Sequence, residues 1–447
     1  MNRLLDAYAA AFQRWMPTPM SIAVLLTFLT AGLGLMFSGP SDVLGVWVEG
    51  LWSPGLIRFG FQAMFMLVLG HVLALSPPVL GLLARFVRWI LAQPAWAAPK
   101  LALLAMGLGW LNWGLGIVGG AILVRGVLQA TRDVPGRKSG VLGAAGYAGM
   151  LVWHGGLSGS APLKVAEPGH LQDLAGEAAW GATLMDTIGL RETIFSSWSL
   201  ILTFSVATAT VFVFYLLGRG MSFEFVEEDG TVDAVEQEGL TSADRGPLLP
   251  WVLGIAAVAG AVWWALASGD LSALKFITPD WINLVLFALS LLAHGSIASL
   301  LRALDEAIGG ASGILIQFPI YFGIMGIVTG TGLGEALSGV LVEVTSSGLL
   351  PLALFTSSAV LNVFVPSGGG QWAVQGPLVL ESCLSLGVPV ERGIMAMAFG
   401  DQLTNMLQPF WALPLLGITG LKARDILPYT LLVMVVAGAV MVLGMLL

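Results

Sequence analysis

Residues 362–377 read NVFVPSGGGQWAVQGP, and long apolar runs flank this stretch on both sides. Pro366 and the three glycines that follow Ser367 predict a break in a helix, because proline lacks a backbone donor and glycine supports a helix poorly. Neutral hydrogen-bonding groups gather at the same place. The candidate binding residues here are Asn362, Ser367, Gly368, Gly369, Gly370, Gln371, Trp372 and Gln375.

The surrounding composition is that of a membrane protein. Hydrophobic residues make up 57% of the 447 residues and the mean hydropathy is +0.87. Charged residues make up 10%, against roughly 25% in soluble domains. The apolar runs are continuous, without the alternation of barrel strands, so the sequence predicts an all-α polytopic fold. At one pass per ~20 residues, we expect about ten to twelve passes plus re-entrant pieces.

A helix break at membrane depth is tolerated only where the backbone faces protein or a water-filled cavity. The free N–H groups at the start of a half-helix attract anions, and free carbonyls can coordinate Na⁺. The alternative interpretation of 362–377 is a kink that serves helix packing alone.

An acidic segment divides the chain into two halves. Residues 219–247 hold eight acids and two bases, which accounts for −6 of the net charge of −8. We expect a first half over 1–218, an aqueous linker over 219–247 and a second half over 248–447. The remaining charge is nearly balanced and indicates no nucleic-acid partner. The single cysteine excludes a multi-cysteine metal site.

The two halves share a weak pattern. Leu361-Asn362 and Gly369-Gly370 recur 250 positions earlier, as Leu111-Asn112 and Gly119-Gly120. Such matches predict two inverted repeats, in which segments 110–121 and 153–163 of the first half correspond to 362–377 and 399–414 of the second. Coincidence in a glycine- and leucine-rich chain is the alternative.

The first-half segments repeat the chemistry of the second. Segment 110–121 contributes Asn112 and Gly114, and segment 153–163 contributes Ser158, Gly159 and Ser160 as candidate binding residues. His154 precedes them. It is a candidate for coupling to a proton, since histidine titrates near neutral pH, or else a hydrogen-bonded structural residue.

Segment 399–414 carries the acidic candidate. On a continuous helix Asp401, Asn405 and Gln408 would share one face, with Gln402 beside it and Trp411 beyond. An ionisable residue at membrane depth is a functional candidate by default. Asp401 is therefore a candidate proton carrier or cation ligand; the alternative is a buried carboxylate that only orders the helices. Trp411 and Trp372 could form the wall for an apolar tail, or simply pack.

These motifs resemble the short-chain fatty acid transporter (AtoE) family. The resemblance rests on long ungapped stretches that cover nearly the whole chain: NWGLGIVGGA (112–121), GGLSGSAPL (155–163), IQFPIYFGI (316–324), VPSGGGQWAVQGP (365–377) and FGDQLTNMLQPFWALPLL (399–416). It implies a secondary transporter in the bacterial inner membrane, within a wider ion-transporter superfamily with inverted repeats, re-entrant hairpins and elevator movement. The implied substrates are short monocarboxylates such as butyrate or acetoacetate.

The residues agree with a small anionic substrate. Half-helix N-termini and neutral donors suit one carboxylate, and no Arg or Lys lies in the four broken segments. We therefore expect a cation- or proton-coupled carrier, with Na⁺ or H⁺ as coupling ion and no cofactor. A dicarboxylate or other organic-anion carrier is the alternative, and a passive channel is a weaker one.

Other expectations concern enzymes and partners. The sequence contains no Walker loop, nucleophile elbow or His/Cys metal cluster, so no enzyme is expected. The expected partners are the carboxylate substrate and the lipid bilayer, with a homodimer as a further expectation.

Overall fold

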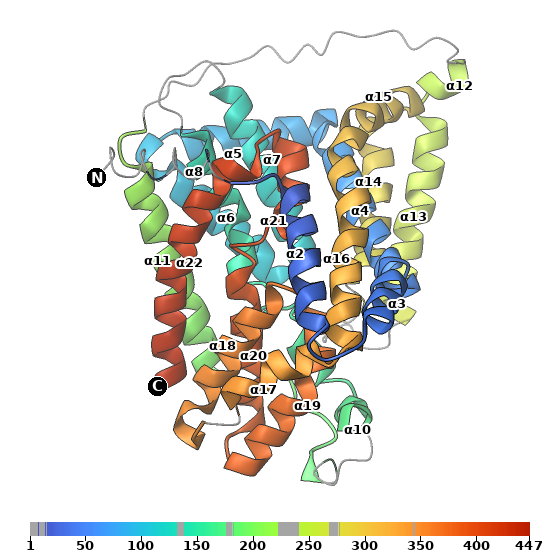
Figure 1. Ribbon diagram of the computed structural model, residues 1–447. Coiled ribbons are helices and arrows are strands. Elements are labelled where there is room, and N and C mark those ends of the chain that lie inside the picture. The colour runs from blue at the N-terminus through green and yellow to red at the C-terminus, as the bar shows by residue number, and fades with distance from the viewer. Residues whose placement is uncertain are drawn as a thin grey trace.

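The structure is a computed structural model, and it describes residues 8, 14, 16–131, 138–175, 181, 183–221, 241–267, 276, 278–342 and 345–447 (Figure 1). All secondary structure within these ranges is helical. The predicted all-α class is therefore confirmed. Most of the predicted linker, residues 222–240, lies outside the described residues; its described end forms the short helix α12 (Ser242–Arg245).

Several helices are long and apolar enough to cross a membrane. They are α4 (Pro54–Ala74), α7 (Trp113–Ala130), α11 (Ser197–Gly218), α13 (Leu248–Ala267) and α22 (Ala423–Leu446). Shorter apolar helices add to them: α2 (Pro19–Gly34), α14 (Pro279–His294), α16 (Ser312–Gly330), α18 (Leu350–Asn362) and α21 (Pro409–Thr419). The chain is thus a multi-pass membrane protein, which agrees with the expected location in the inner membrane of a bacterium.

Proline and glycine mark where many helices begin and end. Proline is the first residue of α2, α4, α14 and α21, and also of α3 (Pro40–Leu51) and α5 (Pro77–Leu91). At that position its missing N–H would have no helical partner anyway. Gly295, Gly387 and Gly420 follow helix ends with φ of 64°, 66° and 70°, a left-handed conformation that glycine adopts without strain.

The helices pack in two groups. The first group contains α2, α3, α4, α13, α14, α16 and α15 (Ile297–Ile308). The second contains α7, α11, α18, α21, α22, α6 (Ala97–Leu111), α8 (Ser139–Tyr147), α19 (Gly368–Leu386) and α20 (Val390–Thr404). Helices α4 and α16 of the first group contact α7 and α21 of the second. In Figure 1, α13 and α14 lie at the right of the molecule and α11 and α22 at the left.

Two helical hairpins belong to the second group. In the first, α6 and α7 are separated by Asn112 alone, and their glycines Gly109 and Gly116 lie in contact. In the second, α18 and α19 are joined by residues 363–367. The predicted breaks at 110–121 and 362–377 therefore both fall at the tip of an antiparallel helix pair.

Two broken helices complete the group. Helix α8 continues as a 3₁₀ turn η2 (Ala148–Leu151), loses regular structure over 152–159 and resumes as α9 (Ser160–Lys164). Helix α20 ends at Thr404, and α21 begins at Pro409. The expectation of one continuous helical face from Asp401 to Gln408 is wrong, because Pro409 lacks the N–H that would continue the helix.

The second part of each broken helix contacts the hairpin of the other half. Helix α21 packs against α7, while α9 packs against α19 and α20. The α18–α19 hairpin lies at the lower end of Figure 1, and α5, α8 and α15 lie at the opposite end. The contacts of α21 with α7 and of α9 with α19 agree with two related halves. The relation of the halves as inverted repeats stays a prediction.

Glycines allow the first hairpin to approach the first broken helix closely. A Cβ atom on Gly109 would lie 2.5 Å from the carbonyl oxygen of Gly149 and 2.8 Å from its Cα. On Gly116 it would lie 2.5 Å from the Cα of Gly109. Small residues at such contacts let membrane helices pack backbone to backbone.

We predict that Gly109→Ala destabilises the protein, whereas Gly107→Ala on the same helix does not. Overpacking costs about 1–3 kcal/mol, and here the clash is with backbone that cannot rotate away. The exposed Gly107 has open space around its Cβ direction, so alanine there gains about 0.5–1 kcal/mol of helix propensity. Thermal unfolding in detergent checks this; equal melting temperatures for both variants would contradict the close packing.

Candidate functional site

The two broken helices meet through Gln402. Its Oε1 accepts hydrogen bonds from the backbone N–H groups of His154, at 3.0 Å, and Gly155, at 3.1 Å. Tyr147 donates to the carbonyl of Asn405 at 2.8 Å, in the break after α20. These bonds satisfy backbone groups that both breaks would otherwise leave unpaired in a buried place.

His154 and Asp401 face each other at this meeting point. Their Nδ1 and Oδ2 atoms are 2.9 Å apart, and the side chains are 0% and 1% exposed. His154 Nε2 accepts the backbone N–H of Ala161 at 3.2 Å, so the nitrogen that faces Asp401 is Nδ1. Neither Asp401 oxygen accepts an aligned hydrogen bond from the described residues. Asp401 is therefore a buried carboxyl group without an aligned hydrogen bond, and the His154 ring is its close polar contact.

A network of amides surrounds the backbone next to Asp401. Asn362 Nδ2 lies 2.7 Å from the Asp401 carbonyl, 3.0 Å from Thr404 Oγ1 and 2.9 Å from Asn405 Oδ1. Gln408 donates to the carbonyl of Asn362. The structure thus brings Asn362, Asp401, Asn405 and Gln408 together, and leaves Asn362 Oδ1 and Gln408 Oε1 without a donor.

The tip of the first hairpin is fully capped. Asn112 Oδ1 accepts from the N–H groups of Gly114, at 2.9 Å, and Leu115, at 3.2 Å. Ser158 Oγ accepts from Trp113 N at 2.9 Å. Asn112, Gly114 and Ser158 therefore join the α6–α7 hairpin to the irregular segment 152–159, and the first turn of α7 has no N–H left for an anion.

The tip of the second hairpin is only partly capped. Ser367 Oγ accepts from Gly370 N at 3.2 Å, and its carbonyl accepts from Gln371 N at 2.7 Å. The N–H groups of Gly368 and Gly369 have no acceptor in the described part of the chain. A Cβ on Gly368 would lie 2.8 Å from His154 Cε1 and 3.1 Å from Ser160 Oγ, so α19 begins directly against the break that contains Gly159 and Ser160.

Three predicted residues of the second hairpin face other groups. Gln371 Nε2 lies 2.9 Å from the Ser358 carbonyl and 3.0 Å from Gln375 Oε1, and Gln375 donates to Ser357 at 3.1 Å. These amides connect α18 to α19 inside the hairpin. Trp372 donates from Nε1 to His170 at 2.9 Å, on α10 (His170–Ala175), and so faces away from the hairpin tip.

Trp411 belongs to an aromatic cluster beside the breaks. Its ring centroid lies 5.3 Å from that of Trp113, 6.2 Å from Phe59 and 6.3 Å from Trp153. Phe410 follows at 5.1 Å. The cluster places apolar surface next to the His154–Asp401 pair.

The residues predicted from the sequence do not include Trp153, Trp113, Phe59 and Tyr147. Trp153 and Trp113 directly adjoin the predicted residues His154 and Asn112, so their place in the motifs was a usable signal. Phe59 and Tyr147 lie in ordinary apolar helices, and nothing in their local sequence marks them. No group of three or more His, Cys, Asp or Glu that could hold a metal ion occurs in the described ranges.

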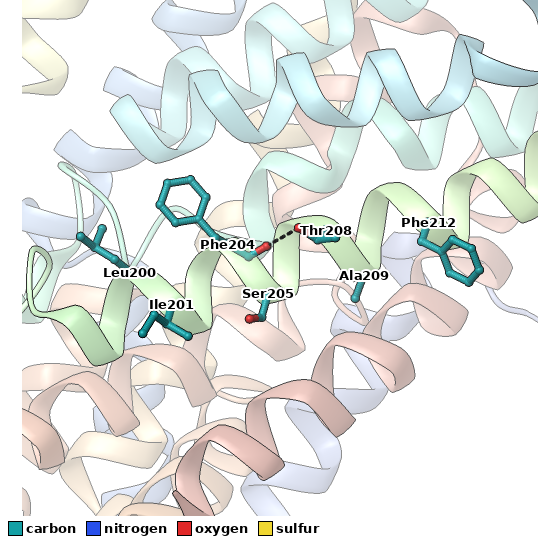
Figure 2. A pocket seen from close by; sticks show the side chains of 7 residues that line it. All are labelled: Leu200, Ile201, Phe204, Ser205, Thr208, Ala209 and Phe212. Atoms are coloured by element: carbon teal, nitrogen blue, oxygen red, sulfur yellow. Dashed lines mark hydrogen bonds between the residues drawn. The ribbon is translucent and has the colours of Figure 1, made fainter.

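An open apolar groove lies elsewhere, on the outer face of α11. Figure 2 shows the residues that line it: Leu200, Ile201, Phe204, Ser205, Thr208, Ala209 and Phe212. The hydroxyl group of Thr208 donates a hydrogen bond to the carbonyl of Phe204 at 2.8 Å, within the same helix. The groove comes from one helix and contains none of the predicted site residues, so we do not assign substrate binding to it.

Comparisons with known proteins identify the family. A family described as "Short chain fatty acid transporter" matches residues 1–447. Two bacterial proteins named "Putative short-chain fatty acid transporter" are similar over 97% of this chain and 96% of their own. The one from Escherichia coli (strain K12) is 33% identical, and the one from Haemophilus influenzae (strain Rd) is 31% identical.

Among solved structures, the Alcanivorax borkumensis YdaH transporter has a TM-score of 0.44 and 16% identity, covering 96% of this chain and 98% of that one. The match of the family to every residue, together with relatives above 30% identity, leads to one conclusion. The chain belongs to the short-chain fatty acid transporter family.

Proposed function

We propose that this protein is a secondary active transporter that takes up short-chain monocarboxylates, such as butyrate or acetoacetate, together with H⁺ or Na⁺. The names of its relatives support the substrate class. The proposed binding site lies where the α19 N-terminus meets the break at 152–159, and Asp401 carries the coupling ion.

The observation that carries the proposal is the buried carboxyl group of Asp401, which faces the ring of His154. It is 1% exposed, His154 Nδ1 lies 2.9 Å from its Oδ2, and neither oxygen accepts an aligned hydrogen bond from the described residues. A substrate carboxylate placed ~6 Å away would be repelled by about 3 kcal/mol at an effective dielectric constant of about 20. A cation on Asp401 removes this repulsion, so the substrate and the cation bind better together than apart.

The donors available to the substrate suit one carboxylate. They are the free N–H groups of Gly368 and Gly369, helped by the positive end of the α19 dipole. No Arg or Lys lies in the broken segments, so a second carboxylate would be buried without a charged partner. This disfavours the dicarboxylate alternative.

The first test is uptake of labelled butyrate, acetoacetate and succinate into proteoliposomes. We expect butyrate and acetoacetate to accumulate under an inward H⁺ or Na⁺ gradient and succinate not to accumulate. Neutral butyric acid crosses bilayers unaided, so the measured quantity is the difference from protein-free liposomes under the same gradient. Equal uptake with and without protein under every gradient would contradict the proposed function, and accumulation of succinate would favour the dicarboxylate alternative.

The second test is Asp401→Asn, which removes the charge but keeps the size. We expect protein-dependent accumulation to fall about tenfold or more, because the coupling ion loses its ligand, while exchange of internal for external butyrate continues. The exposed Asp42→Asn on α3 is the matched control and should behave as the unaltered protein. Undiminished accumulation by folded Asp401→Asn would remove Asp401 from the coupling mechanism.

A further inference from the structure

Trp153 occupies a central place that the binding proposal above leaves unused. It lies just after η2, where the first broken helix loses its regular structure, and it is 3% exposed. Its ring stacks on the His154 ring, with centroids 4.5 Å apart and an interplanar angle of 19°. The residue therefore lies against the histidine that faces Asp401.

The indole N–H of Trp153 has no acceptor in the described part of the chain, although it is buried. Buried tryptophans usually pair this group, as Trp198 does with the Gly444 carbonyl and Trp281 with the Ala261 carbonyl, each at 3.0 Å. Trp47 is also buried without a partner at this atom, but it lies on α3 against Gly323 of α16, in the other helix group. An unused donor at Trp153 therefore calls for an acceptor from outside the chain.

The same tryptophan borders the partly capped start of α19. A Cβ on Gly368 would lie 2.8 Å from Trp153 Cη2, so the benzene edge of the indole touches the first residue of that helix. The N–H groups of Gly368 and Gly369 are themselves without acceptors. The ring that carries the orphaned donor thus contacts the first residue of a 19-residue helix, whose N-terminal N–H groups and dipole favour an anion.

We propose that Trp153 is a substrate-binding residue whose indole N–H donates a hydrogen bond to the substrate carboxylate, alongside the amides of Gly368 and Gly369. This inference rests on the proposed function and assigns the carboxylate its side-chain donor. The rings of Trp411, Trp113 and Phe59 continue from Trp153 and form the apolar surface beside the substrate tail. The site then takes a linear acid with one carboxylate and a short apolar tail.

The test is Trp153→Phe, which keeps an aromatic ring on His154 and removes the N–H. Butyrate exchange in proteoliposomes should show KM raised about tenfold or more, the usual effect of losing a hydrogen bond to a charged group, with Vmax little changed. The factor should be the same for propionate, butyrate and valerate, because the lost bond is to the carboxylate. Trp47→Phe removes the other orphaned indole N–H and should leave KM unchanged.

Binding is measured separately from transport. Butyrate should raise the melting temperature of the unaltered protein and of Trp47→Phe, and should raise that of Trp153→Phe much less at the same concentration. The melting temperature without butyrate reports folding. If Trp153→Phe is unfolded, Trp153→Leu repeats both measurements, since leucine also fills apolar space there and has no hydrogen-bond donor.

The outcomes separate the two proposals. If the unaltered protein shows no protein-dependent transport of monocarboxylates, the proposed function is wrong. Normal transport together with an unchanged KM in the folded variant would overturn the assignment of Trp153 alone. A KM change that grows or shrinks with chain length would also overturn it, because the tryptophan would then contact the tail and not the carboxylate.

Discussion

Every backbone N–H and C=O group within a bilayer needs a partner in the protein, and this requirement organises the centre of the molecule. Two hairpin tips and two helix breaks interrupt the helices where these segments meet. Gln402 accepts two N–H groups of the first break, and Tyr147 donates to a carbonyl of the second. Because each break is satisfied by groups from the other half of the chain, neither half can form this centre alone.

The polar groups that remain without hydrogen-bond partners include both donors and acceptors. Donors without acceptors include the amides of Gly368 and Gly369, the indole of Trp153 and the side-chain amide of Asn405. Acceptors without donors include the oxygens of Asp401. Unused donors suit an anion and unused acceptors suit a cation. A co-transported pair would satisfy both sets at once, and this is why the proposed coupling follows from the hydrogen bonds and not from charge alone.

Much of the fold follows from local sequence. Pro366 and the glycines after Ser367 predicted a helix break, because proline and glycine act on the backbone within a few residues, and in the structure this break lies at the tip of the second hairpin. The N-capping role of Asn112 at the first tip was not predicted. The prediction of one helical face from Asp401 through Gln408 was wrong for a similarly local reason. Helix α20 ends at Thr404, before Asn405 and Gln408, and Pro409 begins the next helix. The polar motifs lie in regions that meet in the folded chain, but they did not indicate what each side chain does there.

Those roles were decided by tertiary contacts. From sequence alone, Asn112, Ser158, Gln371 and Trp153 all stand in polar or glycine-rich stretches of apolar sequence. In the folded chain the first two cap α7 and the third joins two helices, while Trp153 keeps a free donor. Hydropathy and helix breakers determine the membrane class and the places where helices stop, because both act locally. Whether a polar group is used up or left for a ligand depends on partners that can lie about 250 residues away, and no local pattern records them.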